Sequence, residues 1–416
     1  MDCDVVVVGA GLAGLECART LGELGVDVTV VEAAEAVGGR VRSETIDGFT
    51  VDRGFQLLNP AYPMVRRRID LTALDLQSFE AGVAVRRESG LAVVADPRRS
   101  PRRIAQTLRS GYLRPRELAA LARWAAPALR SGKRLLASED STLTQSLAEA
   151  HVRGRLRREV LEPFLAGVLA DDTGQTSATF VRLLVRMFLL GTPAVPAAGM
   201  GALPRQIADD VRGHVALGTP VRGISRSGNS WRVVSDADSW TARCVVVATD
   251  PRSAEHLAGT PSPTMKGLVT FWYATPTAPT SAGLLVVDGR RRPAGPVTTR
   301  TAGPVINAAV MPAAYAPPGR HLVEVTCLLA GEVDEAEARR QAGEMVGAGT
   351  GGWQEITRHE IPDALPSQPA PQVTRTPVAL GDGLFVCGDH RDTASIQGAL
   401  VSGHRTARAV AAALRG

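Results

Sequence analysis

The stretch from Asp4 to Glu32 narrows the choice of fold more than any other part of the sequence. Residues 4–8 form a continuous, mostly β-branched apolar run, as expected for a strand buried on both faces of a parallel sheet. GAGLAG follows at 9–14 and opens a helical pattern that closes at Gly25. A second strand over residues 26–31 ends in Glu32. This order predicts a Rossmann-like α/β unit.

Each glycine of GAGLAG has a mechanical role in binding a dinucleotide. Gly9 makes the tight turn, Gly11 lets the backbone approach a pyrophosphate, and Gly14 lets the helix lie close to the strand. The free N–H groups at the start of the helix face the phosphates. Glu32 can accept hydrogen bonds from ribose hydroxyls, and its charge repels a 2′-phosphate, which favours FAD or NAD over NADP. The predicted contacts are Gly9, Gly11, Leu12, Ala13, Gly14, Glu32 and Ala33.

The loop VGGRVRS, at residues 37–43, carries a second glycine motif. Two adjacent glycines leave room for backbone to pass against the dinucleotide, and Arg40 can reach a phosphate or a flavin edge. With VDRGFQ at 51–56, the chain resembles the flavin-containing amine oxidase superfamily, which includes amine oxidases, protoporphyrinogen oxidase and phytoene desaturase-like enzymes. The resemblance rests on Gly9, Gly11, Gly14, Glu32, Gly38, Gly39, Arg40, Ser43, Asp52, Gly54 and Gln56. It implies flavin contacts at these positions and at Val41 and Phe55.

A middle segment follows the order of the same family. The glycines of PAAGMGALPRQIADDV, at 196–211, precede a helical pattern, and we expect a strand over 215–221. In the family such a strand carries backbone contacts to the adenine. A hairpin over residues 231–248 then ends in ATDP. The resemblance implies cofactor contacts at Val221, Ala248 and Thr249.

The C-terminal motif LFVCGDH, at 384–390, predicts another buried strand that ends in Gly-Asp. In the family the Asp389 position binds the ribityl chain or the pyrophosphate. The helix that begins near Ser395 points its N-terminus at the flavin N1–C2=O edge, where reduced flavin develops negative charge that a helix N-terminus stabilises. The implied contacts are Gly388, Asp389, Ser395, Ile396 and Gln397.

These motifs imply two discontinuous domains. The FAD-binding domain comprises residues 1–60, 196–258 and 376–416, and the substrate-binding domain comprises 61–195 and 259–375. For the substrate domain we predict an α+β structure that is helical in its first part. Its second part holds an antiparallel sheet over the flavin. The strands are expected near 268–274, 283–288, 305–310, 322–329 and 353–361, with a helix over 333–346.

Candidate substrate and catalytic residues depend on the resemblance. Amine oxidases often hold a water near flavin N5 with a lysine on the first strand after the middle FAD segment, and Lys266 lies close to that place. A lysine that merely solvates a strand end is the alternative. His390 follows the Gly-Asp pair and is a candidate base or substrate contact, or only a hydrogen-bonding partner of its loop. Further substrate candidates are Gln56, Tyr62 and Trp272.

The residues near the C-terminal helix also bear on cofactor attachment and activity. The aromatic pair that frames the flavin in amine oxidases is not evident there, since His390, Thr393 and Ala394 occupy the neighbourhood. This puts amine-oxidase activity in doubt, although not membership of the superfamily. No cysteine lies among those residues, so we expect FAD to be held non-covalently.

An arginine-rich helical segment lies in the substrate domain. Arg116, Arg123, Arg130 and Arg134 fall on one face of the pattern over residues 116–137, and Pro127 should break it. The apolar face is expected to comprise Leu118, Leu121, Ala125, Leu129 and Leu136. A solvated arginine face explains this pattern, and a surface that docks on anionic lipid is the alternative.

Composition excludes other classes of protein. Apolar residues make up 44% and charged residues 21%, which is typical of a globular chain. No apolar run is long enough to span a membrane, and the N-terminus does not resemble a signal peptide. The five cysteines are scattered along the chain, which argues for reduced thiols in the cytoplasm and against a metal site. Aromatics at 4% are too few for a nucleic-acid stacking platform.

The sequence therefore predicts an FAD-dependent oxidoreductase that removes two electrons, formally a hydride, from a C–H bond of a small molecule, with an amine as the first candidate. An isoprenoid or carotenoid desaturase-like enzyme is the main alternative. A nicotinamide-linked reductase is disfavoured because no second glycine motif appears. A non-catalytic flavin-binding protein stays open, because the cofactor motifs would be the same. Substrate, electron acceptor and oligomeric state do not follow from the sequence.

Overall fold

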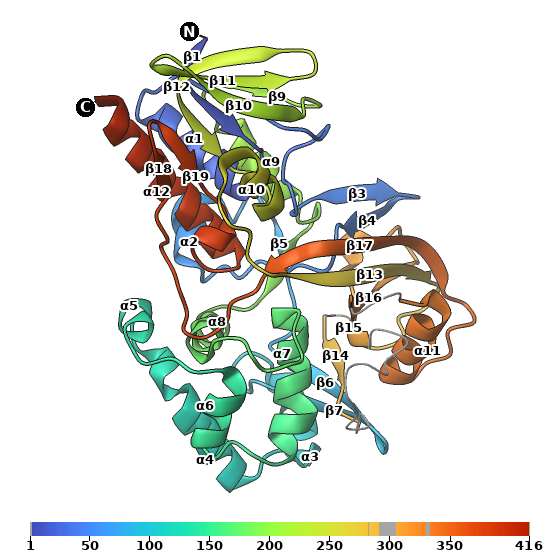
Figure 1. The fold of residues 1–416 in the computed structure, drawn as a ribbon. Coiled ribbons are helices and arrows are strands. Elements are labelled where there is room, and N and C mark those ends of the chain that lie inside the picture. The colour runs from blue at the N-terminus through green and yellow to red at the C-terminus, as the bar shows by residue number, and fades with distance from the viewer. Residues whose placement is uncertain (1, 282, 291–304, 330–332, 416) are drawn as a thin grey trace.

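The computed structural model describes residues 2–281, 283–290, 305–329 and 333–415. Two sheets organise the chain (Figure 1). In the first, strand β1 lies between β12 and β2, parallel to both, while β9 extends the sheet beyond β2 and β19 pairs with β12. The strands β10, β11 and β12 form an antiparallel meander, so this sheet is mixed. Its strands are β1 (Cys3–Val8), β2 (Val28–Val31), β9 (His214–Ala216), β10 (Val221–Ser227), β11 (Ser230–Ser235), β12 (Ser239–Val247), β18 (Ala379–Gly381) and β19 (Leu384–Val386).

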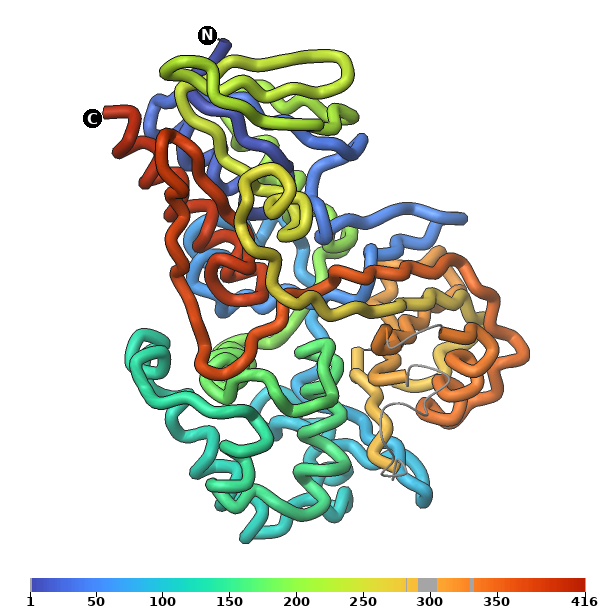
Figure 2. The backbone as a smooth tube through the Cα atoms, in the orientation of Figure 1, coloured from blue at the N-terminus to red at the C-terminus, as the bar shows by residue number. Residues whose placement is uncertain are grey.

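This first unit is assembled from segments that are far apart in the sequence. Figure 2 shows N-terminal, middle and C-terminal stretches of the chain side by side in it. Helix α1 lies against α12, and a Cβ atom at Gly403 would fall 2.2 Å from the carbonyl oxygen of Ala13. A side chain at Gly403 would therefore push the two helices apart. The helices of this part are α1 (Leu12–Glu23), α2 (Pro63–Arg68), α9 (Ala202–Asp209), α10 (Pro251–Ala258) and α12 (Ile396–Arg415).

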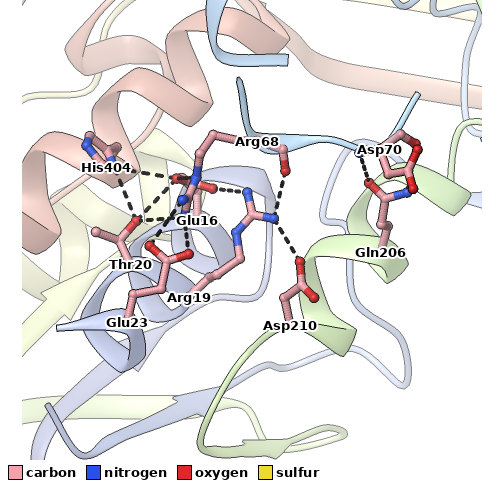
Figure 3. Close-up of polar contacts among 9 residues, drawn as sticks. All are labelled: Glu16, Arg19, Thr20, Glu23, Arg68, Asp70, Gln206, Asp210 and His404. Carbon is pink, nitrogen blue, oxygen red and sulfur yellow. Dashed lines mark hydrogen bonds and ion pairs between the residues drawn. The ribbon is translucent and has the colours of Figure 1, made fainter. Parts of the chain in front are cut away.

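A buried ion cluster ties α1 to α2 and α12 (Figure 3). Glu16 is fully buried, and its carboxylate lies 2.5 Å from Nη2 of Arg19 and 2.9 Å from Nε of Arg68. Nδ1 of His404, on α12, lies 3.6 Å from the same carboxylate. Arg68 also pairs with Glu23 at 2.9 Å. The cluster compensates a buried charge with charges from neighbouring elements.

The second sheet has the order β17-β13-β16-β15-β14-β6-β7. The expected all-antiparallel sheet is wrong in one respect, because β14 pairs with β6 in parallel. Helix α11 (Glu335–Val346) packs on the face that carries Val269, Phe271 and Tyr273. The strands are β6 (Gly82–Arg87), β7 (Gly90–Ala95), β13 (Met265–Thr275), β14 (Leu285–Asp288), β15 (Val305–Val310), β16 (His321–Leu328) and β17 (Gln354–Pro366).

Two strand predictions need correction. The region 61–195 is not purely helical, because β6 and β7 form a hairpin that joins the second sheet. The strand expected over 215–221 is two strands, β9 and β10, which lie on opposite sides of the first sheet. Gly218, with φ of +63°, lies in the turn between them. Two further small pairs are β3 (Ser43–Ile46) with β4 (Phe49–Asp52) and β5 (Leu76–Ser78) with β8 (Ala194–Pro196).

The helical part of the second unit breaks at Pro127 as predicted, but a different face is buried. Helix α4 ends at Ala125, and a 3-10 turn over Ala126–Leu129 changes the phase before α5. Leu118, Leu129 and Leu136 are exposed, whereas Ala120, Trp124, Ala128 and Leu135 are buried. The helices are α3 (Ile104–Arg109), α4 (Pro115–Ala125), α5 (Gly132–Leu136), α6 (Leu143–Glu149), α7 (Glu162–Leu169) and α8 (Ala178–Leu190). None of the helices in the described ranges is long and apolar enough to cross a membrane.

Candidate functional site

The first glycine turn lies at the end of β1, between β12 and β2. Gly9 has φ of +108°, and a Cβ atom there would lie 2.8 Å from the carbonyl oxygen of Ala248. A Cβ at Gly14 would lie 2.0 Å from the carbonyl oxygen of Gly9, so α1 can start only because Gly14 has no side chain. Gly11 is different, since its Cβ position meets no atom within 4 Å. The two outer glycines thus serve packing, while Gly11 faces open space.

Glu32 lies at the end of β2 and holds the turn in place. Its Oε2 accepts a hydrogen bond from the N–H of Ala10 at 2.6 Å, and its Oε1 accepts one from the N–H of Ala34 at 2.9 Å. The side chain is half-buried. A carboxylate at the end of β2, beside the glycine turn, is a group that could accept hydrogen bonds from ribose hydroxyls.

The Gly38-Gly39 loop lies directly against this turn. The N–H of Gly38 donates to the carbonyl oxygen of Ala10 at 2.8 Å, and Gly38 forms an isolated β-bridge with Gly11. A Cβ at Gly39 would lie 3.3 Å from Cα of Gly11. Both loop glycines have positive φ, +118° and +58°, which other residues rarely adopt. The structure therefore brings together the two glycine motifs of the sequence.

Arg40 joins this loop to the C-terminal motif. Its Nη2 lies 2.6 Å from Oδ1 of Asp389, and its Nη1 donates to the carbonyl oxygen of Ala364 on β17 at 3.0 Å. Burial opposes the charge on Arg40, but Asp389 raises the pKa of the guanidinium above its usual value. Gln56 donates from Nε2 to the carbonyl oxygen of Arg40, while its buried Oε1 has no partner within the described part of the chain.

The start of α12 lies next to that contact. Ser395 caps the helix, because its Oγ accepts the N–H of Gly398 at 3.0 Å. Gln397 faces α2, where its Oε1 accepts the N–H of Met64 at 2.9 Å. Burial lowers the pKa of His390 to about 4, so the ring is neutral near pH 7. Neither ring nitrogen of His390 has a hydrogen-bond partner among the residues that the structure describes.

The buried carboxylate of Asp52 is the centre of a hydrogen-bonded cluster. Its carboxylate accepts hydrogen bonds from Oγ of Ser43 at 2.5 Å, from the N–H of Met200 at 2.8 Å and from the hydroxyl of Tyr315 at 2.9 Å. Burial raises the pKa of Asp52 to about 6, against the effect of these donors. The side chain thus connects β4, the turn before α9 and the segment before β16. Ser43 extends this cluster, because its Oγ accepts a hydrogen bond from the N–H of Gly201 at 2.7 Å.

Lys266 is held in an ion pair that the sequence did not reveal. Its Nζ lies 2.9 Å from Oδ2 of Asp171 and 3.1 Å from Oγ1 of Thr176. Burial alone would raise the pKa of Asp171, but hydrogen bonds from Thr173, Thr176 and Lys266 lower it to about 2. Lys266 pairs across strands with Leu365, the neighbour of the Ala364 that Arg40 contacts. The ion pair therefore lies close along β17 to the contact of Arg40.

The remaining predicted residues lie around the same edge or behind it. Ala248 and Thr249 end β12 beside Gly9, and Val41 is buried behind the second glycine loop. Val221 begins β10 at the far side of the meander. The ring of Phe55 lies edge-on to that of Phe79, with 5.9 Å between the ring centroids, and Gly54 has φ of +85°. Tyr62 lies at the start of α2, where burial raises its pKa to about 12. Trp272 is fully buried in β13.

The geometry of these residues is compatible with a bound flavin dinucleotide. The space in front of Gly11 would accept a pyrophosphate against free backbone, and Gly39 beside it is exposed. Gln56 and His390 leave buried polar atoms without partners at the same edge, as expected where a polar ligand supplies them. We find no group of three metal-ligating side chains in the described ranges.

The fold and this edge define a flavin-binding oxidoreductase class. The chain belongs to the flavin containing amine oxidoreductase family, whose model matches residues 12–411. It is 43% identical over 86 residues to putrescine oxidase of Kocuria rosea, a match that covers 20% of this chain and 18% of that protein. It is 26% identical over 307 residues to L-amino acid dehydrogenase of Synechocystis sp., covering 64% and 59%. Less than two thirds of either relative is therefore matched.

Solved structures share the fold. A putative protoporphyrinogen oxidase from Exiguobacterium sp. 255-15 superposes with a TM-score of 0.73 at 19% identity, with 99% of each chain covered. Cyclohexylamine oxidase from Brevibacterium oxydans IH-35A superposes with a TM-score of 0.68 at 17% identity, with all of both chains covered. At these identities the likeness establishes a common mixed α/β architecture.

Proposed function

We propose that this protein uses non-covalently bound FAD to oxidise a small amine, removing two electrons and a proton from the carbon that bears the nitrogen. The observation that carries the proposal is the contact of Arg40 with Asp389, which joins the Gly38-Gly39 loop to the C-terminal Gly-Asp motif at the edge where the first glycine turn ends. FAD would supply the electron acceptor. The chain would bind it, exclude water and orient the substrate.

Each motif has a task in this proposal. Glu32 would accept the ribose hydroxyls, the free backbone at Gly11 would approach the pyrophosphate, and the capped start of α12 would stabilise negative charge on the reduced ring. Non-covalent attachment is supported by Cys387, the cysteine of the C-terminal motif, because it is fully buried in the core of the first unit. The two discontinuous domains drawn from the sequence are part of the proposal. So is a cytoplasmic location, which the five scattered, buried cysteines support.

Lys266 and Asp171 are proposed to act at the substrate end. An amine must be neutral to lose a hydride, so a buried cation beside the reacting carbon favours the neutral form of the substrate. Asp171 would position Lys266 without touching substrate. His390, whose pKa burial lowers to about 4, would remain an uncharged hydrogen-bond partner for the substrate.

The first test is absorbance of the purified protein. We expect a yellow protein whose flavin is released by acid precipitation and bleaches anaerobically when amines are added. A colourless protein that does not take up FAD would contradict the proposal. Bleaching by polyprenoids alone would move the reaction to the desaturase class, and flavin that no substrate reduces would indicate a binding protein.

A variant sharpens this test. R40M removes a partly buried charge-assisted contact, each of which contributes about 1.5–3 kcal/mol, so FAD affinity should fall by one to two orders of magnitude. R53M is the matched control, because Arg53 is exposed in the next loop. Equilibrium dialysis with FAD measures both. Equal affinity in R40M and R53M would show that Arg40 does not support the cofactor.

A second pair of variants separates the roles of Lys266 and Asp171. We expect K266M to lower kcat by about tenfold or more, in the range seen for a positioned acid–base group, and D171N to lower it less while moving the alkaline limb of the pH–rate profile. Q175A is the control, since Gln175 is exposed in the same turn and its side chain makes no hydrogen bond with Asp171 among the described residues. An unchanged profile in D171N would reduce Asp171 to a structural partner.

A further inference from the structure

One face of the molecule presents large apolar side chains to solvent. Leu129, Leu136, Leu189 and Leu190 are 71%, 37%, 38% and 57% exposed. They come from the 3-10 turn after α4, from α5 and from the end of α8. We call them the leucine face. Partly exposed leucines gathered from neighbouring elements are uncommon on a soluble protein, and a contiguous patch of them marks an interaction site.

The elements of the leucine face are held together. Nη1 of Arg186, on α8, donates to the carbonyl oxygens of Ala128 and Leu129 at 3.0 and 3.2 Å. A Cβ at Gly132, the first residue of α5, would lie 3.5 Å from the side chain of Leu183 on α8. Figure 1 shows α5, α8 and α12 along the same side of the molecule.

Two grooves are lined by residues of α2, and one of them adjoins the leucine face at Leu190. One, of about 430 Å³, is lined by Arg66, Arg67, Arg186 and Leu190 among others. The second, of about 420 Å³, shares Arg67 and adds Arg375 and Arg405. No Asp or Glu lines either groove among the described residues. Both grooves are therefore positively charged, and the first opens beside the exposed Leu190.

Asp392 compensates part of the positive charge on this side, because its Oδ2 lies 3.4 Å from Nη1 of Arg405 and Arg375 also acts on its pKa. Arg66, Arg67 and Arg375 are exposed, and none makes an ion pair with a carboxylate of the described residues. Lys133 and Arg134, on α5, are exposed between Leu129 and Leu136. A second copy of the chain could cover the leucines only by bringing arginines against arginines in a symmetric contact. Phosphate headgroups above an acyl layer complement both features.

We propose that the leucine face and the two grooves dock the protein on a membrane that carries anionic lipid. Leu129 and Leu190 enter the acyl boundary, while Arg66, Arg67 and Arg375 bind lipid phosphates. This surface shares Leu129, Leu136 and Arg134 with the pattern that the sequence suggested over residues 116–137. It leaves out Arg116 and Arg123 and adds α2, α8 and the segment before β18. It does not depend on the proposed oxidation.

The test is sedimentation of the full-length protein with vesicles. Binding is expected with phosphatidylglycerol mixed into phosphatidylcholine, little with phosphatidylcholine alone, and a steep loss as salt is raised. The double variant L129E/L190E and the double variant R66Q/R67Q should each bind at least tenfold more weakly. Circular dichroism melts confirm that both stay folded.

Two matched variants test the location. L24E, at the end of α1, and L108E, on α3, replace leucines that are 48% and 66% exposed outside the leucine face, and both should bind like the parent protein. Absence of vesicle binding by the parent protein overturns the proposal. A loss in L108E equal to that in L129E/L190E also overturns it, because the docking surface would then lie on α3.

Discussion

Two fully buried glutamates, one in each unit, show opposite ways of burying an acid. Glu16, in α1, contacts Arg19 and Arg68. Glu324, in β16, has no cation within ion-pair distance among the described residues and accepts a hydrogen bond from Oγ1 of Thr326. The amide of Asn307, oriented so that its nitrogen donates, lies 3.0 and 3.2 Å from the Glu324 carboxylate oxygens.

Glu16 and Glu324 differ in how they stabilise the unit in which each is buried. Burial raises the pKa of Glu324 well above its ordinary value, which favours the protonated, neutral carboxyl as a polar core group. The cluster of Glu16 instead joins α1, α2 and α12, which come from the two ends of the chain. Charge pairing thus serves assembly in the first unit, while neutral hydrogen bonding fills the sheet of the second.

The largest effect should follow from breaking the Glu16 cluster. E16Q leaves the buried Arg19 and the partly buried Arg68 without their shared carboxylate, and breaking a buried pair in this way costs about 3–5 kcal/mol. Urea unfolding measures the loss. E23Q is the control, because Glu23 pairs with the same Arg68 from an exposed position and should cost about 1 kcal/mol or less. Equal losses in both variants would contradict the comparison.

An intermediate effect is expected at Asp52, where the acid is buried with neutral donors only. Its folded-state pKa of about 6 lies above the unfolded value, so the folded state binds more protons between roughly pH 4 and 6, and stability falls as pH rises through that range. Relative to D52N, the parent protein should lose about 1 kcal/mol of unfolding free energy between pH 5 and pH 7. A constant difference across that range would rule out the raised pKa.

The smallest effect should come from E324Q. Because burial favours the neutral acid at this position, the substitution should exchange one hydrogen-bonding group for another, and the free energy of unfolding at pH 7 should change by about 1 kcal/mol or less. Urea unfolding of E324Q beside E16Q gives the direct comparison. A loss in E324Q as large as that in E16Q would mean that Glu324 is ionised and paired.

The sequence predicted the two glycine turns because their constraints are local, and the structure brings these turns together. Gly9, Gly14 and Gly38 must lack side chains for reasons that a short motif carries, and the structure places them in contact with backbone or with a neighbouring turn. The hairpin of β6 and β7 was missed although GVAVRRESGLAVVA carries its signal: two alternating runs separated by a turn.

The helical segment shows where pattern reading fails. The buried face of α4 is chosen by its neighbours, because Trp124 donates to Oγ of Ser146 on α6 and receives Arg182 of α8 over its ring. Small alanines face the core, so leucines that fit a helical stripe lie in solvent. The pair of Lys266 and Asp171 could not be predicted either, since it joins segments that only the tertiary structure brings together.

The close crossing of α1 and α12 has a consequence for biosynthesis. The glycine turn emerges early from the ribosome, yet the strand and helix that complete its sheet and cover α1 are made after almost all of the second unit. Until α12 is synthesised, the side of α1 that packs against it, with its apolar side chains and Glu16, remains exposed to solvent. Cofactor uptake should therefore follow synthesis of α12, and an incomplete chain will expose this surface to aggregation or chaperones.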